Sequence, residues 1–161
     1  MKTKLLLLLS LSVFLGACST EEENMSPQWG IDFSSESSSG FAMGSVDQYK
    51  AETKTSYIVK MANLRSAGDD VFSLSYTFES GDALELRIVK KTPGTDYFFP
   101  GNAGENQLLS AIFNGKPLAL VDSKVSIQPR TDENKLATAT KLQTSEAVVF
   151  DGTIGRVPLL K

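Results

Sequence analysis

Residues 71–89 read VFSLSYTFESGDALELRIV. Apolar and polar side chains alternate on both sides of Ser80-Gly81-Asp82, which is the pattern of two strands with one buried and one wet face. A three-residue turn would place Phe78 opposite Leu84 and Tyr76 opposite Leu86, whereas a two-residue turn would mix the two faces. The stretch therefore predicts a hairpin whose buried side chains are Phe72, Leu74, Tyr76, Phe78, Leu84, Leu86 and Ile88.

Segments of the same kind recur along the rest of the chain. Candidate strands cover residues 57–61, 124–128, 135–142, 147–150 and 154–159. Asn114-Gly115 and Asp151-Gly152 favour tight hairpin turns, because both central residues of such turns have positive φ. With almost no long helical period, the pattern predicts an all-β domain, an antiparallel β-sandwich or small barrel of about seven to eight short strands.

Residues 105–113 allow two interpretations. As a strand, the segment would turn at Asn114-Gly115 and pair Ala111 with Leu118 and Leu109 with Leu120. The rival is a helix that ends at Gly115, because four apolar side chains also have helical spacing. These four are Leu108, Leu109, Ile112 and Phe113.

Composition limits the chemistry that the chain can perform. The 161 residues fit a single domain, and the net charge of −3 gives no basic surface for nucleic acid. The chain has no histidine and one cysteine. A Ser-His-Asp triad, a Cys-His pair, a zinc site of His and Cys, and a disulfide within the chain are therefore excluded. We expect no cofactor and no nucleic-acid partner.

The N-terminus has the features of a secretory signal peptide. Lys2 and Lys4 precede an apolar run over residues 5–17, which is too short to span a bilayer. The run ends in Leu15-Gly16-Ala17-Cys18, and Cys18 is the only cysteine of the chain. This arrangement resembles the lipobox of bacterial lipoproteins. The resemblance implies that residues 1–17 are removed and that Cys18 is diacylated on sulfur and acylated on its amine, which would anchor the protein in a membrane. The alternative is an ordinary signal peptide followed by an incidental cysteine.

An acidic run follows the cysteine closely. Glu21, Glu22 and Glu23 resemble the export signal that directs lipoproteins of Bacteroidota to the outer face of the outer membrane. The order of a lipobox, a tether and one small β domain is similar to that of small Bacteroidota surface lipoproteins of unknown function. The resemblance implies a lipid-anchored protein of the outer membrane, exposed at the cell surface. The alternative is that the acidic run is only a solvated linker.

The mature chain divides into a tether and a folded domain. Residues 18–45 are rich in Ser and Glu and predict a flexible tether after the lipidated cysteine, and residues 46–161 form the predicted β-sandwich domain. Trp29, Ile31 and Phe33 alternate within the tether, so they could dock on the domain's edge.

One loop stands out as a candidate binding site. Tyr97, Phe98 and Phe99 are consecutive aromatics, so they cannot all face one core, and Asn102 follows in a segment rich in Gly and Pro. If Tyr97 and Phe99 point inward, Phe98 points outward, or the reverse. Aromatic side chains beside Asn and Asp are used to bind sugars or proteins. The alternative is a strand end that caps the fold.

Carboxylates offer the remaining route to catalysis or metal binding. Asp69-Asp70 lies in a turn, and Glu79, Asp82 and Glu85 surround the hairpin tip, but nothing places two of them across a cleft. Asp69-Asp70 and residues 132–134 also lack the alternating spacing of a calcium loop. We therefore expect no catalytic residues, no metal site and no enzymatic activity.

The sequence thus predicts a non-catalytic binding or accessory module for a glycan or a protein partner. Two alternatives stay open, namely a structural subunit of an outer-membrane assembly and, third, a small hydrolase built on carboxylates.

Overall fold

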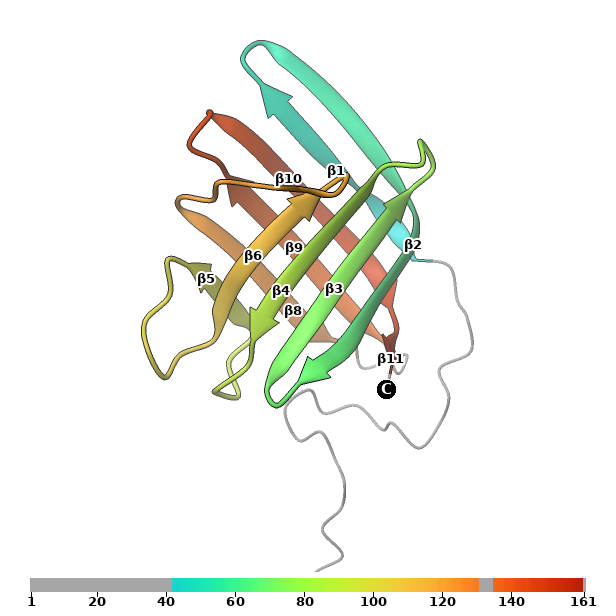
Figure 1. Cartoon of the computed structure of the whole chain (residues 1–161). Helices are drawn as coiled ribbons and strands as arrows, with labels where there is room; N and C mark the ends of the chain where they lie inside the picture. The colour runs from blue at the N-terminus through green and yellow to red at the C-terminus, as the bar shows by residue number, and fades with distance from the viewer. Residues whose placement is uncertain (1–41, 131–134, 161) are drawn as a thin grey trace, which may run out of the picture.

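The computed structural model describes residues 42–130 and 135–160, of which about 70% are in strands and none in helices (Figure 1). The strands are β1 (Met43–Lys50), β2 (Thr53–Gly68), β3 (Val71–Phe78), β4 (Ala83–Val89), β5 (Asp96–Phe99), β6 (Gln107–Phe113), β7 (Lys116–Pro117), β8 (Ser123–Pro129), β9 (Leu136–Gln143), β10 (Val148–Val157) and β11 (Leu159–Leu160). The signal peptide, Cys18, Glu21, Glu22, Glu23 and residues 132–134 lie outside the described residues. β1 begins at Met43, within the range that we assigned to the tether.

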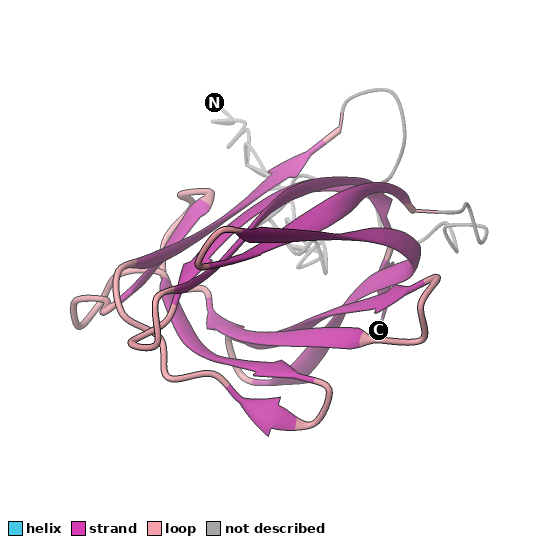
Figure 2. Ribbon diagram, turned by 90° about the horizontal axis from the view of Figure 1, so that it is seen from above, coloured by secondary structure: helices cyan, strands magenta, loops and turns pink. Residues whose placement is uncertain are grey.

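The sheet closes on itself. Its strand order is β1-β10-β9-β8-β5-β6-β4-β3-β2, and β1 also pairs with β2, so nine strands form a barrel (Figure 2). β7 pairs with β6, and β11 runs parallel to β2. The prediction of an all-β fold is confirmed. Of the two predicted architectures the structure is a barrel and not a sandwich, and the count of seven to eight strands is too low. A sandwich would leave strand edges exposed, whereas β1 pairs with β10 on one side and with residues 53–58 of β2 on the other, which closes the sheet.

Alternating side chains fill the interior of the barrel. β3, β4 and β9 each bury every second residue, as the period of two requires. The core includes Val46, Val59, Leu64, Leu74, Tyr76, Phe78, Leu84, Leu86, Ile88, Tyr97, Leu108, Val125, Ile127, Leu142, Phe150 and Ile154. Polar contacts also cross it, since the Tyr76 hydroxyl donates to Thr138 Oγ1 at 2.8 Å and lies 3.2 Å from Thr140 Oγ1.

The β3–β4 hairpin has the predicted faces and a different register. Tyr76 pairs with Leu84 and Leu74 with Leu86, a shift of two residues from the pairing that we expected. The turn is longer than the three residues that we expected, and it is closed by a hydrogen bond from the Phe78 amide to the Asp82 carbonyl at 2.9 Å. A shift of two leaves every side chain on its face, so alternation alone does not detect it.

The two predicted turns have opposite outcomes. Asn114 and Gly115 both have positive φ and form the tight turn between β6 and β7, with the Leu118 amide donating to the Ala111 carbonyl. Residues 107–113 are therefore a strand and not a helix, although Leu120 bridges to Thr144 and not to Leu109.

Asp151-Gly152 is not a turn. It lies inside β10, which runs unbroken through two of the predicted strands. A Cβ at Gly152 would lie 2.6 Å from the Val46 Cα and would also meet the Ser45 carbonyl. The glycine is there because β1 comes too close for a side chain.

Candidate functional site

The three consecutive aromatics lie on β5, between β8 and β6. Tyr97 is fully buried, Phe98 is 44% exposed, and Phe99 is partly buried against the core. The strand alternates its side chains, so Tyr97 faces the barrel interior and Phe98 faces outward. Of the two arrangements that the sequence allowed, the one with Phe98 outside is present.

Tyr97 belongs to a polar cluster inside one end of the barrel. Lys90 follows Leu84, Leu86 and Ile88 at the next inward position, and its Nζ donates to the Gly94 carbonyl at 2.9 Å and to the Tyr97 hydroxyl at 3.3 Å. Burial lowers the pKa of the Lys90 ammonium and raises the pKa of the Tyr97 phenol. Tyr97 is thus a core residue and is not available to a ligand on the outer surface.

Asn106 holds the loop over this end of the barrel. Its Oδ1 accepts from the amides of Lys91 and Thr92, at 2.7 and 2.9 Å, and its Nδ2 donates to the Gly94 carbonyl at 2.7 Å. Sequence reasoning missed Lys90 and Asn106. Lys90 could have been found from the sequence, because it lies two residues after Ile88 and so continues the series of inward-facing positions of β4.

Phe98 lies within a polar strip on the outer face of β5 and β8. The Lys124 Nζ is 5.5 Å from the centre of the Phe98 ring and 2.8 Å from Asp96 Oδ2, and the Ser126 hydroxyl donates to Asp96 Oδ1 at 2.6 Å. We call Asp96, Phe98, Lys124 and Ser126 the Phe98 strip. The hydrogen bond from Lys124, and next that from Ser126, hold the pKa of the Asp96 carboxyl below its usual value.

Asn102 lies in the loop after β5 and not in the strip itself. Its Nδ2 donates to Glu105 Oε2 at 3.1 Å, and its carbonyl accepts from the Gln107 side chain. Gln107 pairs with Phe98 across β5 and β6, so the loop folds back beside the strip. A Cβ at Gly101 would be 2.6 Å from the Gln107 Cγ, which explains the glycine at this close approach.

Of the carboxylates that we considered for catalysis, Asp70 and Asp82 hold turns, and Glu85 on β4 accepts from the Ser73 hydroxyl at 3.0 Å. Asp70 pairs with Lys91 at 2.9 Å, and Asp82 accepts from Ser80 and Asn114. Hydrogen bonds, first from Ser80 and then from Asn114, lower the pKa of Asp82. In residues 42–130 and 135–160, no three His, Cys, Asp or Glu side chains gather as metal ligands. The same residues contain no helix with the length and hydrophobicity needed to cross a bilayer.

Comparisons with protein-family models, with curated proteins and with solved structures find no match to this chain.

Proposed function

We propose that the protein is a surface lipoprotein, anchored through Cys18, whose barrel binds a glycan without catalysis. The observation that supports this function is the Phe98 strip, where an exposed ring lies beside an ammonium, a carboxylate and a hydroxyl. Rings of this kind stack on the apolar face of a sugar, and the polar groups around them bond to its hydroxyls. The bonds of Asp96 with Lys124 and Ser126 already orient these three side chains, so they lose less freedom when a ligand binds.

A glycan fits the strip better than a protein partner does. A stable protein interface covers about 800 Å² on each side, with several aromatic anchors at its centre. Phe98 is the only aromatic ring of the strip, and its neighbours are polar. Lys141 lies opposite Lys124 on β9 and adds a second cation, which favours glycans that carry carboxylate or sulfate groups.

Two features support a non-catalytic role. The chain has no histidine, which is the usual general base near neutral pH. Each described carboxyl group with a shifted pKa, at Asp47, Asp82 and Asp96, is shifted downward. A general acid needs the opposite shift, because it must hold its proton at neutral pH.

A glycan array followed by titration tests the proposal. Phe98→Ala should weaken binding about tenfold, which corresponds to about 1.4 kcal/mol, at little cost in stability because the ring is exposed. Tyr49→Ala removes a similarly exposed aromatic side chain on β1 and should leave binding unchanged. Equal affinity of Phe98→Ala and wild type for the selected glycan would contradict the strip as the site. Capture of a protein and of no glycan would point to the alternative partner class.

A further inference from the structure

A second exposed surface lies on the outer face of β1 and β2, far along the sequence from the Phe98 strip. Met43, Ile58 and Met61 are 60%, 55% and 56% exposed, and we call them the β1–β2 patch. Ser45 pairs with Ile58, and Met43 is two positions from Ser45, so both side chains point outward. An irregularity in the pairing with β3 between Val59 and Met61 places Met61 outside as well, against the simple alternation of residues 57–61.

The barrel wall is incompletely paired beside this patch. β1 pairs with β2 as far as Ile58, and β11 pairs with it only from Leu64 onward. Within the described part of the chain, residues 59–63 therefore have no strand partner on this flank of β2. A stretch of strand without a strand partner on one flank, next to apolar side chains, is suited to receive an extended segment.

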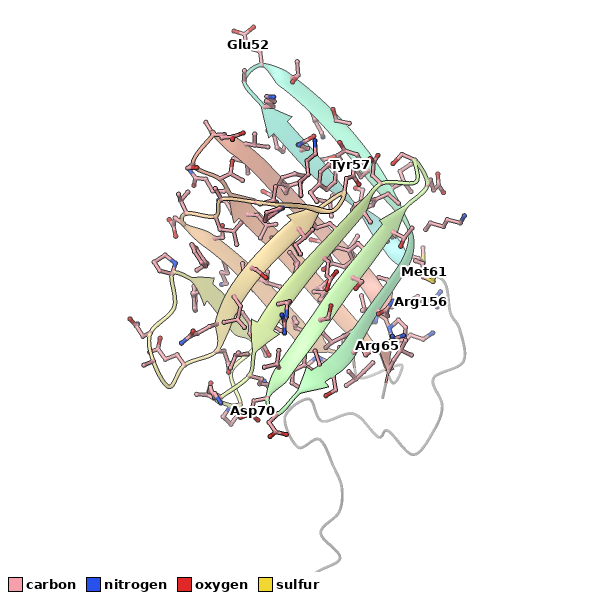
Figure 3. All side chains as sticks on the ribbon, in the orientation of Figure 1. Glu52, Tyr57, Met61, Arg65, Asp70 and Arg156 are labelled. Carbon is pink, nitrogen blue, oxygen red and sulfur yellow. The ribbon has the colours of Figure 1, made fainter. Side chains whose placement is uncertain are left out.

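The rim of the patch is positively charged. Lys60 and Arg65 are exposed on β2, and Arg156 Nη1 lies 3.7 Å from the sulfur of Met43. Met61, Arg65 and Arg156 lie along one flank of the barrel (Figure 3). The outward residues of β3 opposite this part of β2 are uncharged, namely Ser73, Ser75 and Thr77. The exposed acid Glu79 follows β3 and its amide donates to the Ile58 carbonyl at 2.9 Å, so the positive charge lies on the Met61 side of the patch.

We propose that residues 29–33 of the same chain, Trp29-Gly30-Ile31-Asp32-Phe33, dock on the β1–β2 patch. The described chain begins at Ala42, directly before Met43, so the segment is attached at the patch itself. Eight residues lie between Phe33 and Ala42, and nine steps of chain reach up to about 30 Å, far more than the patch requires.

The chemistry of residues 29–33, and not only their position in the chain, supports docking on the β1–β2 patch. Three apolar side chains of the segment match the three of the patch, and Asp32 matches its cationic rim. Residues 18–41 contain five acidic and no basic side chains. A segment held by so short a link has an effective concentration in the millimolar range, so weak contacts are enough to keep it bound. Docking would fix how the barrel is oriented on its tether.

The single tryptophan of the chain, Trp29, gives a direct readout. The protein to use is the chain from Ser19 to Lys161, which keeps every described residue. Its emission should be shifted to the blue and protected from acrylamide. Ile58→Lys and Met61→Lys should each weaken docking about tenfold or more, the size expected for losing one buried aliphatic side chain, and should move the emission to the red. Leu109→Lys, at a 41% exposed position on β6, is the matched control and should behave as wild type.

Other outcomes would overturn the proposal. Solvent-like emission from wild type, or unchanged emission in both patch variants, would mean that the segment does not dock there. A blue shift that disappears on hundredfold dilution would assign the patch to a second copy of the chain. Asp32→Lys changes no residue of the barrel strands, so its expected red shift tests the role of charge separately from the stability of the barrel.

Discussion

Replacement of Tyr76 by Phe removes a buried hydroxyl that reaches across the barrel from β3 to β9. It contacts Thr138 Oγ1 at 2.8 Å and Thr140 Oγ1 at 3.2 Å in a fully buried position. Each such bond stabilises the fold by about 0.5–1.5 kcal/mol net, so Tyr76→Phe should lower the free energy of unfolding by about 1–3 kcal/mol at pH 7. Urea denaturation followed by circular dichroism measures this change.

The same substitution has a second effect at alkaline pH. Burial raises the pKa of Tyr76 to about 12, although its hydrogen bonds with Thr138 and Thr140 oppose the shift. The unfolded phenol ionises near pH 10, so wild type loses stability as the pH rises above that value. The loss from this group is about 1.4 kcal/mol at pH 11. Phe cannot ionise, so the gap between the two proteins should narrow by about that amount between pH 8 and pH 11.

Two results would refute this reasoning. A cost below about 0.5 kcal/mol at pH 7 would mean that the hydroxyl does not make these contacts. A gap that stays constant up to pH 11 would mean that Tyr76 is not buried as a neutral phenol. Tyr49→Phe, at an exposed position on β1, is the control and should change stability at pH 7 by less than about 0.5 kcal/mol.

Three further predictions concern the wall and the N-terminus. Gly152→Ala should lower the free energy of unfolding by about 1–3 kcal/mol, because the new Cβ meets the backbone of β1. Gly155→Ala is the control and should cost less, because its Cβ would have no contact closer than 3.6 Å. Equal costs of the two substitutions would contradict the close approach of β1 to Gly152. Labelled palmitate should enter wild type but not Cys18→Ala, and equal label in both would end the lipoprotein interpretation. Replacing Glu21, Glu22 and Glu23 by Ala should protect the barrel from protease added to intact cells; unchanged shaving would mean that the run is only a linker.

Much of the candidate site was within reach of the sequence. Three consecutive aromatics on a strand must divide between two faces, so an outward ring at Phe98 was one of two possible outcomes. The Lys124–Asp96 ion pair that flanks the ring was not predictable. Its two residues are 28 positions apart, and only the pairing of β5 with β8 brings them together.

Local pattern alone determined that the chain is all-β, which side chains of residues 71–89 are buried, and that Asn114-Gly115 is a turn. These properties depend on the alternation of side chains and on φ preferences, both of which act within a few residues. Tertiary structure decided the register of the hairpin, because a shift of two preserves every face.

Tertiary structure also decided closure and the role of Gly152. β1 precedes β10 by about a hundred residues, and their pairing is what makes the sheet a barrel and leaves no space for a side chain at Gly152. The same dipeptide type, Asp-Gly or Asn-Gly, serves as a turn at residue 114 and as a strand interior at residue 151. Local preference is worth about 1 kcal/mol or less, whereas pairing and packing along a whole strand sum over many residues and therefore override it.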